Sequence, residues 1–153
     1  MSDTAASSTF HSNPNDFADI NLDLSNLISK NSKDEISNNL SVYCPRCPSL
    51  ILRPNDGLYV ESSLSLVDTR AKPKGEKLDQ FESFRLKYFW RVDDIFTFEN
   101  IGYTNTVDGR YKYLTCADCE CGPLGVQILS EDDLESGLKK NSSYLALARV
   151  MHR

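Results

Sequence analysis

Long apolar runs are missing from this chain of 153 residues: no stretch approaches the roughly 18 consecutive apolar residues that a membrane-spanning helix needs. A basic stretch leading into an apolar one, typical of a secretory signal, is missing as well. We therefore expect a soluble, cytoplasmic protein without direct membrane insertion. The 17 Lys and Arg against 22 Asp and Glu give a net charge of −5, which argues against binding to nucleic-acid phosphates.

Motifs for catalysis are missing too. The sequence has no phosphate-binding loop, no paired-carboxylate pattern and no nucleophile elbow, and it holds only two histidines, His11 and His152. We therefore do not expect an enzyme. The five cysteines are an odd number in a chain for which export is not expected, so metal ligation is a better interpretation than paired disulfides. The length allows one ordinary domain, and we expect a monomer.

The acidic excess is concentrated near the N-terminus. Residues 1–43 hold six of the 22 acidic residues and two of the 17 basic ones, so the remainder is almost neutral. Residues 1–41 are also rich in Ser and Asn and poor in large apolar groups, which predicts a disordered tail before a domain at residues 42–153. Within the tail, the apolar residues between Phe17 and Ile28 are spaced regularly enough to dock as a short helix or strand, but scattered hydrophobes in a tail are the favoured interpretation.

From Val42 onward, short β-like runs alternate with turn residues. This texture predicts a mostly β fold: a single antiparallel, tent-like domain with at most one short helix. The helix would begin at Ser130, where the spacing up to Leu134 resembles a capping box, and residues 70–77 should form a basic surface loop. The predicted strands lie at residues 49–52, around Leu64 and Leu66, around Phe96 and Phe98, and at residues 111–116, 125–129 and 143–150.

Two Cys-x-x-Cys pairs carry the strongest chemical prediction. Each two-residue spacer lets a tight turn aim two sulfurs at one ion, and two such turns supply the four thiolates of a tetrahedral zinc site. One structural Zn²⁺ is therefore expected, stapling two hairpins that are 68 residues apart in sequence. Redox chemistry of a single Cys-x-x-Cys is the weaker alternative, because no βαβ pattern surrounds either pair. The predicted ligands are Cys44, Cys47, Cys116 and Cys119.

Cys121 is the fifth cysteine, and two roles are open to it. It could act as a nucleophile in a reductase, but the neighbouring sequence is acidic and offers no activating histidine. A spare thiol beside the zinc-binding turn is the favoured interpretation.

A second informative stretch runs from Trp90 to Tyr103 and mixes large apolar groups with carboxylates. In a strand, the adjacent Ile95 and Phe96 cannot both face the core, so part of this stretch should be exposed. Apolar side chains ringed by acids are typical of a protein-binding hot spot for a basic partner. Asp118 adds to this pattern, because the tight turn between two metal ligands should direct its side chain outward.

Four motifs in this order resemble the Rab-interacting factor family, over about residues 42–153. The resemblance implies a zinc-binding, β-rich domain that binds exocytic Rab GTPases, promotes guanine-nucleotide release slowly and holds the nucleotide-free form, with a chaperone-like role in vesicular transport. The motifs are Cys-Pro-Arg-Cys at 44–47, Asp-Ile-Phe-Thr-Phe-Glu-Asn-Ile-Gly-Tyr-Thr at 94–104, Cys-Ala-Asp-Cys-Glu followed by Gly-Pro-Leu-Gly at 116–125, and Tyr-Leu-Ala-Leu-Ala-Arg-Val at 144–150.

The resemblance also implies residue roles. It places the family's zinc ligands on the four cysteines named above and its GTPase-binding surface on Asp94, Ile95, Phe96 and Asp118, with Ile95 where the family often has Met. It gives no role to Cys121 or to the Ser- and Asn-rich tail. The alternative is a zinc-ribbon-like module that binds nucleic acid or protein without exchange activity; the acidic net charge argues against its nucleic-acid form.

Overall fold

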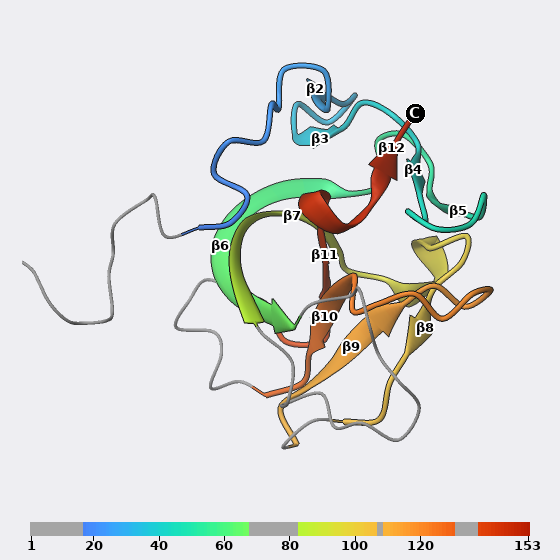
Figure 1. Cartoon of the computed structure of the whole chain (residues 1–153). Helices are drawn as coiled ribbons and strands as arrows, with labels where there is room; N and C mark the ends of the chain where they lie inside the picture. Colours follow the sequence, from blue (N-terminus) through green and yellow to red (C-terminus); the bar gives the residue numbers. More distant parts are fainter. Residues whose placement is uncertain (1–16, 68–82, 107–108, 131–137) are drawn as a thin grey trace, which may run out of the picture.

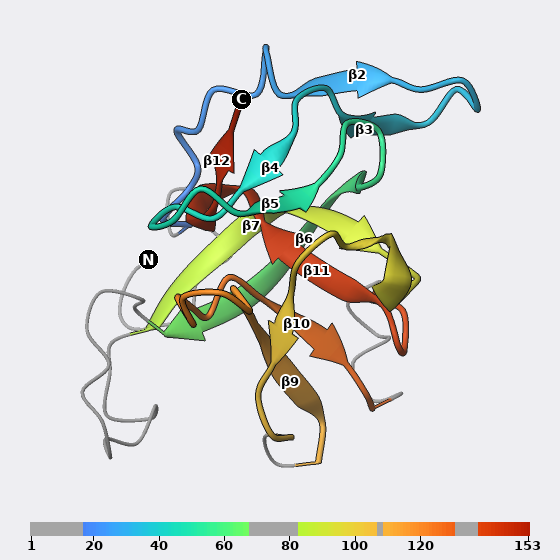
Figure 2. The ribbon, with the colours of Figure 1, turned by 90° about the vertical axis from the view of Figure 1, so that its right-hand side faces the viewer.

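The computed structural model describes residues 17–67, 83–106, 109–130 and 138–153, and these form two antiparallel sheets (Figure 1). The eight-stranded sheet has the order β2 (Ile28–Lys30), β3 (Ile36–Asn38), β6 (Leu58–Val67), β7 (Ser83–Val92), β11 (Ser143–Ala146), β10 (Gly125–Ile128), β9 (Tyr111–Thr115) and β8 (Gly102–Tyr103). The three-stranded sheet has the order β12 (Met151–His152), β4 (Val42–Tyr43) and β5 (Leu50–Leu52). The small sheet lies beside β2 and β3 (Figure 2).

The long strands β6 and β7 organise the large sheet. They pair antiparallel from Leu58 opposite Arg91 to Val67 opposite Ser83, with one irregularity between Glu61 and Leu64. Strand β7 continues the sheet on its other side, where residues 89–92 pair with β11. Each of these two strands has ten residues, and the shorter strands β3 and β11 pair with them on either side.

Both faces of the sheet are buried. Consecutive residues of a strand point to opposite faces, so Trp90 belongs to one core cluster and its neighbour Phe89 to another. Strand β9 divides in the same way, with Leu114 on the side of Trp90 and Tyr113 on the side of Phe89. The cluster that contains Trp90 also includes Cys44 and Cys116, and Cys47 packs against it, so three of the four predicted metal ligands border this core.

The predicted mostly β class is confirmed. Strands lie at or within the predicted segments 49–52, 111–116 and 125–129 and around Leu64 and Leu66, whereas the segment 143–150 divides into β11 and a 3₁₀ helix, η5 (Leu147–Arg149). Within the described ranges no α-helix occurs, and no helix there is long and apolar enough to cross a membrane. The loop expected at residues 70–77 and most of the helix expected from Ser130 lie outside the described residues.

The strand predicted around Phe96 and Phe98 is wrong. Ile95–Thr97 form a 3₁₀ helix, η3, because Asp94 has an extended backbone and its side chain accepts a hydrogen bond from the Phe96 N–H at 2.9 Å. Such a cap satisfies an amide that a strand would have to pair with a neighbouring chain segment. The two phenylalanine rings lie in different environments, since Phe96 is exposed and Phe98 is buried.

The chain differs from the expected disordered tail over residues 17–41. The carboxylate of Asp19 is buried and accepts hydrogen bonds from the backbone N–H groups of Lys87 and Tyr88 at 3.0–3.1 Å. Further along, Asn38 is fully buried, and its side chain bonds to backbone groups of the turn 53–57. The start of the segment, at Ala18 and Asp19, thus docks on strand β7 of the same chain. Two kinds of contact order these residues: polar side chains that satisfy backbone groups, and four apolar side chains that pack against the core cluster of Trp90, namely Leu22, Leu24, Leu27 and Ile28. Composition alone does not reveal such contacts.

Candidate metal centre and adjoining surface

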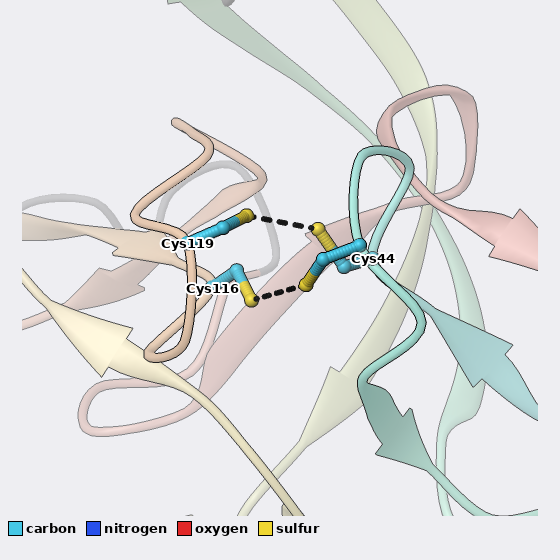
Figure 3. Close-up of side chains that lie close together, drawn as sticks. Cys44, Cys116 and Cys119 are labelled. Carbon is cyan, nitrogen blue, oxygen red and sulfur yellow. Dashed lines mark hydrogen bonds between the residues drawn. The ribbon is translucent and has the colours of Figure 1, made fainter.

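The structure brings the four predicted metal ligands together. Cys44 and Cys47 come from the turn between β4 and β5, and Cys116 and Cys119 from the turn after β9. The sulfur of Cys44 lies 3.5 Å from that of Cys119, and the sulfur of Cys47 lies 3.6 Å from that of Cys116 (Figure 3). All four sulfurs lie within 4.8 Å of one another, so they could hold one metal ion.

Backbone hydrogen bonds shape both turns. In the first turn, the Cys44 N–H donates to the Ser49 carbonyl at 3.0 Å. In the second, the Cys116 N–H donates to the Cys121 carbonyl at 2.9 Å and the Glu120 N–H donates to the Cys116 carbonyl at 2.8 Å. Glu120 accordingly takes a left-handed conformation, with φ of 64°. These bonds hold each pair of sulfurs on the same side of its turn.

The ionisation of the sulfurs depends on burial and on nearby N–H groups. Burial raises the pKa of Cys44 and raises that of Cys119 to about 12. Burial acts on Cys116 in the same direction, but N–H groups of its own turn and the side-chain amide of Asn100 outweigh it and lower the pKa of Cys116 to about 6. Four neighbouring thiolates repel one another, so a bound cation is what allows all of them to ionise.

The donor set fits a structural metal. Four thiolates complete a tetrahedral shell around one ion and leave no position for water or substrate. A metal held here would stabilise the fold rather than take part in chemistry. The ligands come from turns far apart in sequence, so the ion would join the small sheet to the end of β9.

Cys121 lies beside this centre but outside the group of four sulfurs. It is buried, and burial raises the pKa of its thiol. A raised pKa is the opposite of what a nucleophilic thiol requires at neutral pH. The structure therefore favours the inert thiol over the reductase alternative.

The residues predicted to bind a GTPase surround the turn η3. Phe96 is the most exposed large hydrophobic residue of the described chain, at 87%, and Ile95 is 43% exposed. Ile95 and Asp118 line one shallow depression of about 440 Å³, together with residues 98–101 and Ala117. Phe96 does not line this depression, and Asp94 lines a second groove, of about 550 Å³, whose opposite wall includes the turn between β2 and β3.

Two polar residues near this surface were not predicted from the sequence. The Ser49 hydroxyl donates a hydrogen bond to the carboxylate of Asp118, across the two cysteine turns. The Asn100 side chain donates a hydrogen bond to the sulfur of Cys116 and accepts one from the backbone N–H of Ala117. A serine two residues after Cys47 and an asparagine in a loop are common residues, and no spacing rule marks them.

Comparison with known proteins gives the family. A family model described as Mss4 protein matches residues 37–152. The chain belongs to the Mss4 family. It is 41% identical over 116 residues to a Drosophila melanogaster protein named guanine nucleotide exchange factor MSS4 homolog, covering 76% of this chain and 86% of that relative. A Schizosaccharomyces pombe protein of the same name is 32% identical over 112 residues, covering 73% of this chain and 95% of the relative.

Membership of the Mss4 family confirms the resemblance found in the sequence motifs. The match includes all four clustered cysteines and the stretch from Asp94 to Tyr103. It begins at residue 37, so β2 and the turn that follows it lie before the matched region, although they pair with the sheet.

Proposed function

We propose that the protein is a guanine-nucleotide release factor that binds a Rab-type small GTPase, promotes release of GDP or GTP and holds the nucleotide-free form. The observation that carries the proposal is the exposed Ile95–Phe96 pair, flanked by the carboxylates of Asp94 and Asp118, next to the four-cysteine centre. The names of the two relatives support the exchange activity. In this role the chain would support exocytic transport as a chaperone-like regulator, reaching secretory membranes through its partner.

The chemistry of nucleotide release fits this surface. A GTPase holds its nucleotide through Mg²⁺ and a phosphate-binding loop with a lysine. A release factor must therefore bind the empty or rearranged site better than the filled one. Asp94 and Asp118 would pair with basic groups freed by the departing phosphates. Ile95 and Phe96 would pack on apolar surface that becomes exposed when the switch segments rearrange.

The four cysteines would hold one structural Zn²⁺, the ion whose preferred coordination their donor set matches. The residues that do the binding are then separate from the residues that hold the metal. Asp118 is the link between them, because it lies between two of the ligands in sequence.

The test is a set of Rab GTPases loaded with a fluorescent guanine nucleotide, mixed with the full chain. We expect the chain to accelerate nucleotide release from at least one Rab and to bind that Rab more tightly when it is nucleotide-free than when it is GTP-loaded. Equal binding to both forms would instead indicate an adaptor without exchange activity. The Asp118→Asn variant should slow release while its zinc content stays equal to that of the wild type. Unchanged release by both this variant and Phe96→Ala would refute the assigned surface.

A further inference from the structure

Asn100 joins the two segments that form the proposed binding surface. It lies between η3 and β8, and its side-chain Nδ2 donates to the Sγ of Cys116 at 3.4 Å. The Oδ1 of the same amide accepts from the backbone N–H of Ala117 at 3.0 Å. One planar amide group therefore contacts a metal-ligand sulfur and the backbone immediately before Asp118.

Other contacts hold the η3 loop and the second cysteine turn on either side of Asn100. The loop that carries η3 is anchored at one side by the buried ring of Phe98 and by a hydrogen bond from the Glu99 N–H to the Ile51 carbonyl at 2.8 Å. The turn that carries Asp118 is held by its own backbone bonds and by the Ser49 hydroxyl. Beyond Asn100, the pairing of Gly102 with Thr115 joins the two segments again. Asn100 thus connects the η3 loop to the second cysteine turn through its side chain, and it lines the depression that Ile95 and Asp118 share.

We propose that Asn100 is a positioning residue, which sets the distance between the η3 loop and Asp118 and so presents Ile95, Phe96 and Asp118 to the GTPase as one surface. This inference rests on the proposed function. It assigns to Asn100 a role in recognition that passes through the cysteine turn rather than through contact with the partner.

The chemistry suits an amide at this position. The N–H···S bond spreads the negative charge of a thiolate, which is a charge-assisted hydrogen bond. An aspartate at position 100 would keep the shape and could still accept from the Ala117 N–H. It could not donate to the Cys116 sulfur and would place a second negative charge beside it. Asn100→Asp therefore removes the donor half of the bridge, and Asn100→Ala removes both halves.

The experiment uses the full chain and compares these two variants with Asn105→Ala, which truncates an exposed asparagine of the loop after β8. Three properties are measured: the zinc content, the thiolate-to-metal charge-transfer bands after Co²⁺ substitution, and the rate of nucleotide release from a responsive GTPase. For Asn100→Asp and Asn100→Ala we expect one metal per chain and a shifted charge-transfer band. Release by Asn100→Asp should slow roughly fivefold to tenfold, because it loses about one hydrogen bond at 1.4 kcal/mol per factor of ten, and Asn100→Ala, which loses both, should slow it at least as much. Asn105→Ala should match the wild type in all three.

The outcomes separate this inference from the proposed function. If the wild-type chain accelerates release and both Asn100 variants accelerate it equally well, the positioning role is refuted while the exchange function stands. If both variants lose the metal, Asn100 belongs to the metal site alone, and the inference also fails. If the wild-type chain accelerates release from none of the GTPases, the proposed function itself has failed, and the positioning role fails with it.

Discussion

Truncation of Phe96 gives the sharpest test of the binding surface, because this ring is 87% exposed while Phe98, two residues away, is only 8% exposed. A phenylalanine side chain presents on the order of 200 Å² to solvent, so a partner that covers Phe96 fully would bury about 170 Å² of it. At about 25 cal/mol/Å², this burial stabilises the complex by up to about 4 kcal/mol. Incomplete coverage reduces the figure to about 2 kcal/mol. The Phe96→Ala variant should therefore bind a nucleotide-free GTPase roughly 30 to 1,000 times more weakly.

The matched control for this prediction is Phe98→Ala. Removing the exposed ring should leave the free energy of unfolding within about 0.5 kcal/mol of the wild type. Removing the buried ring should lower it by about 3–5 kcal/mol. Urea denaturation measures both values, and titration with nucleotide-free GTPase measures binding. Wild-type affinity in Phe96→Ala, with the fold intact, would show that the ring lies outside the interface and would refute the reasoning.

Three further predictions concern the fold. A strong chelator should unfold the domain, because a structural zinc contributes on the order of 10 kcal/mol to the free energy of folding. Fluorescence of the fully buried Trp90 measures the unfolding, and Cys121→Ser should unfold as the wild type does. Asp19→Ala should lower the free energy of unfolding by about 1.5–3 kcal/mol, because it leaves two β7 amides without their charged acceptor. Asp23→Ala at an exposed position should cost well under half as much, and equal losses in urea denaturation would refute the role of the Asp19–β7 hydrogen bonds. Burial lowers the pKa of His152 from 6.5 to about 4, so the unfolded chain binds the proton more readily and the free energy of unfolding should fall as the pH drops from about 6.5 to 4. The unfolding temperature should therefore change less with pH in His152→Gln than in the wild type, and an equal change in both would contradict the assignment.

The sequence predicts the grouping of the four cysteines well because its determinants are local. A two-residue spacer between cysteines fixes the turn, and the turn fixes the direction of both sulfurs. The long strand pair was predictable only in part. Alternating Leu64 and Leu66 reveal β6, whereas β7 is buried on both faces and shows no clean alternation.

The remaining features depend on contacts between distant residues. Asp19 is ordered by amides of β7 that lie 68 and 69 positions further along the chain. No local pattern distinguishes it from the exposed acids of the same segment. Asn100 was missed for the same reason, since its two partners come from the second cysteine turn. The turn at η3 does have a local signal in the sequence, because an aspartate before a short apolar run is a common cap.

The two sides of the proposed surface differ in how firmly they are held. Asp118 lies between two of the four clustered cysteines and receives a hydrogen bond from Ser49, so contacts on both cysteine turns set its position. Phe96 lies on a turn without buried residues, and a hydrogen bond from its N–H to the carboxylate of Asp94 holds its backbone. A surface with one fixed carboxylate and one adjustable ring loses little entropy at the fixed side on binding and can adapt at the other. That combination suits a partner whose own site changes shape as nucleotide leaves. It also means that Asp94 has two tasks, capping the turn and presenting charge, so removing its side chain would disturb the ring as well as the charge.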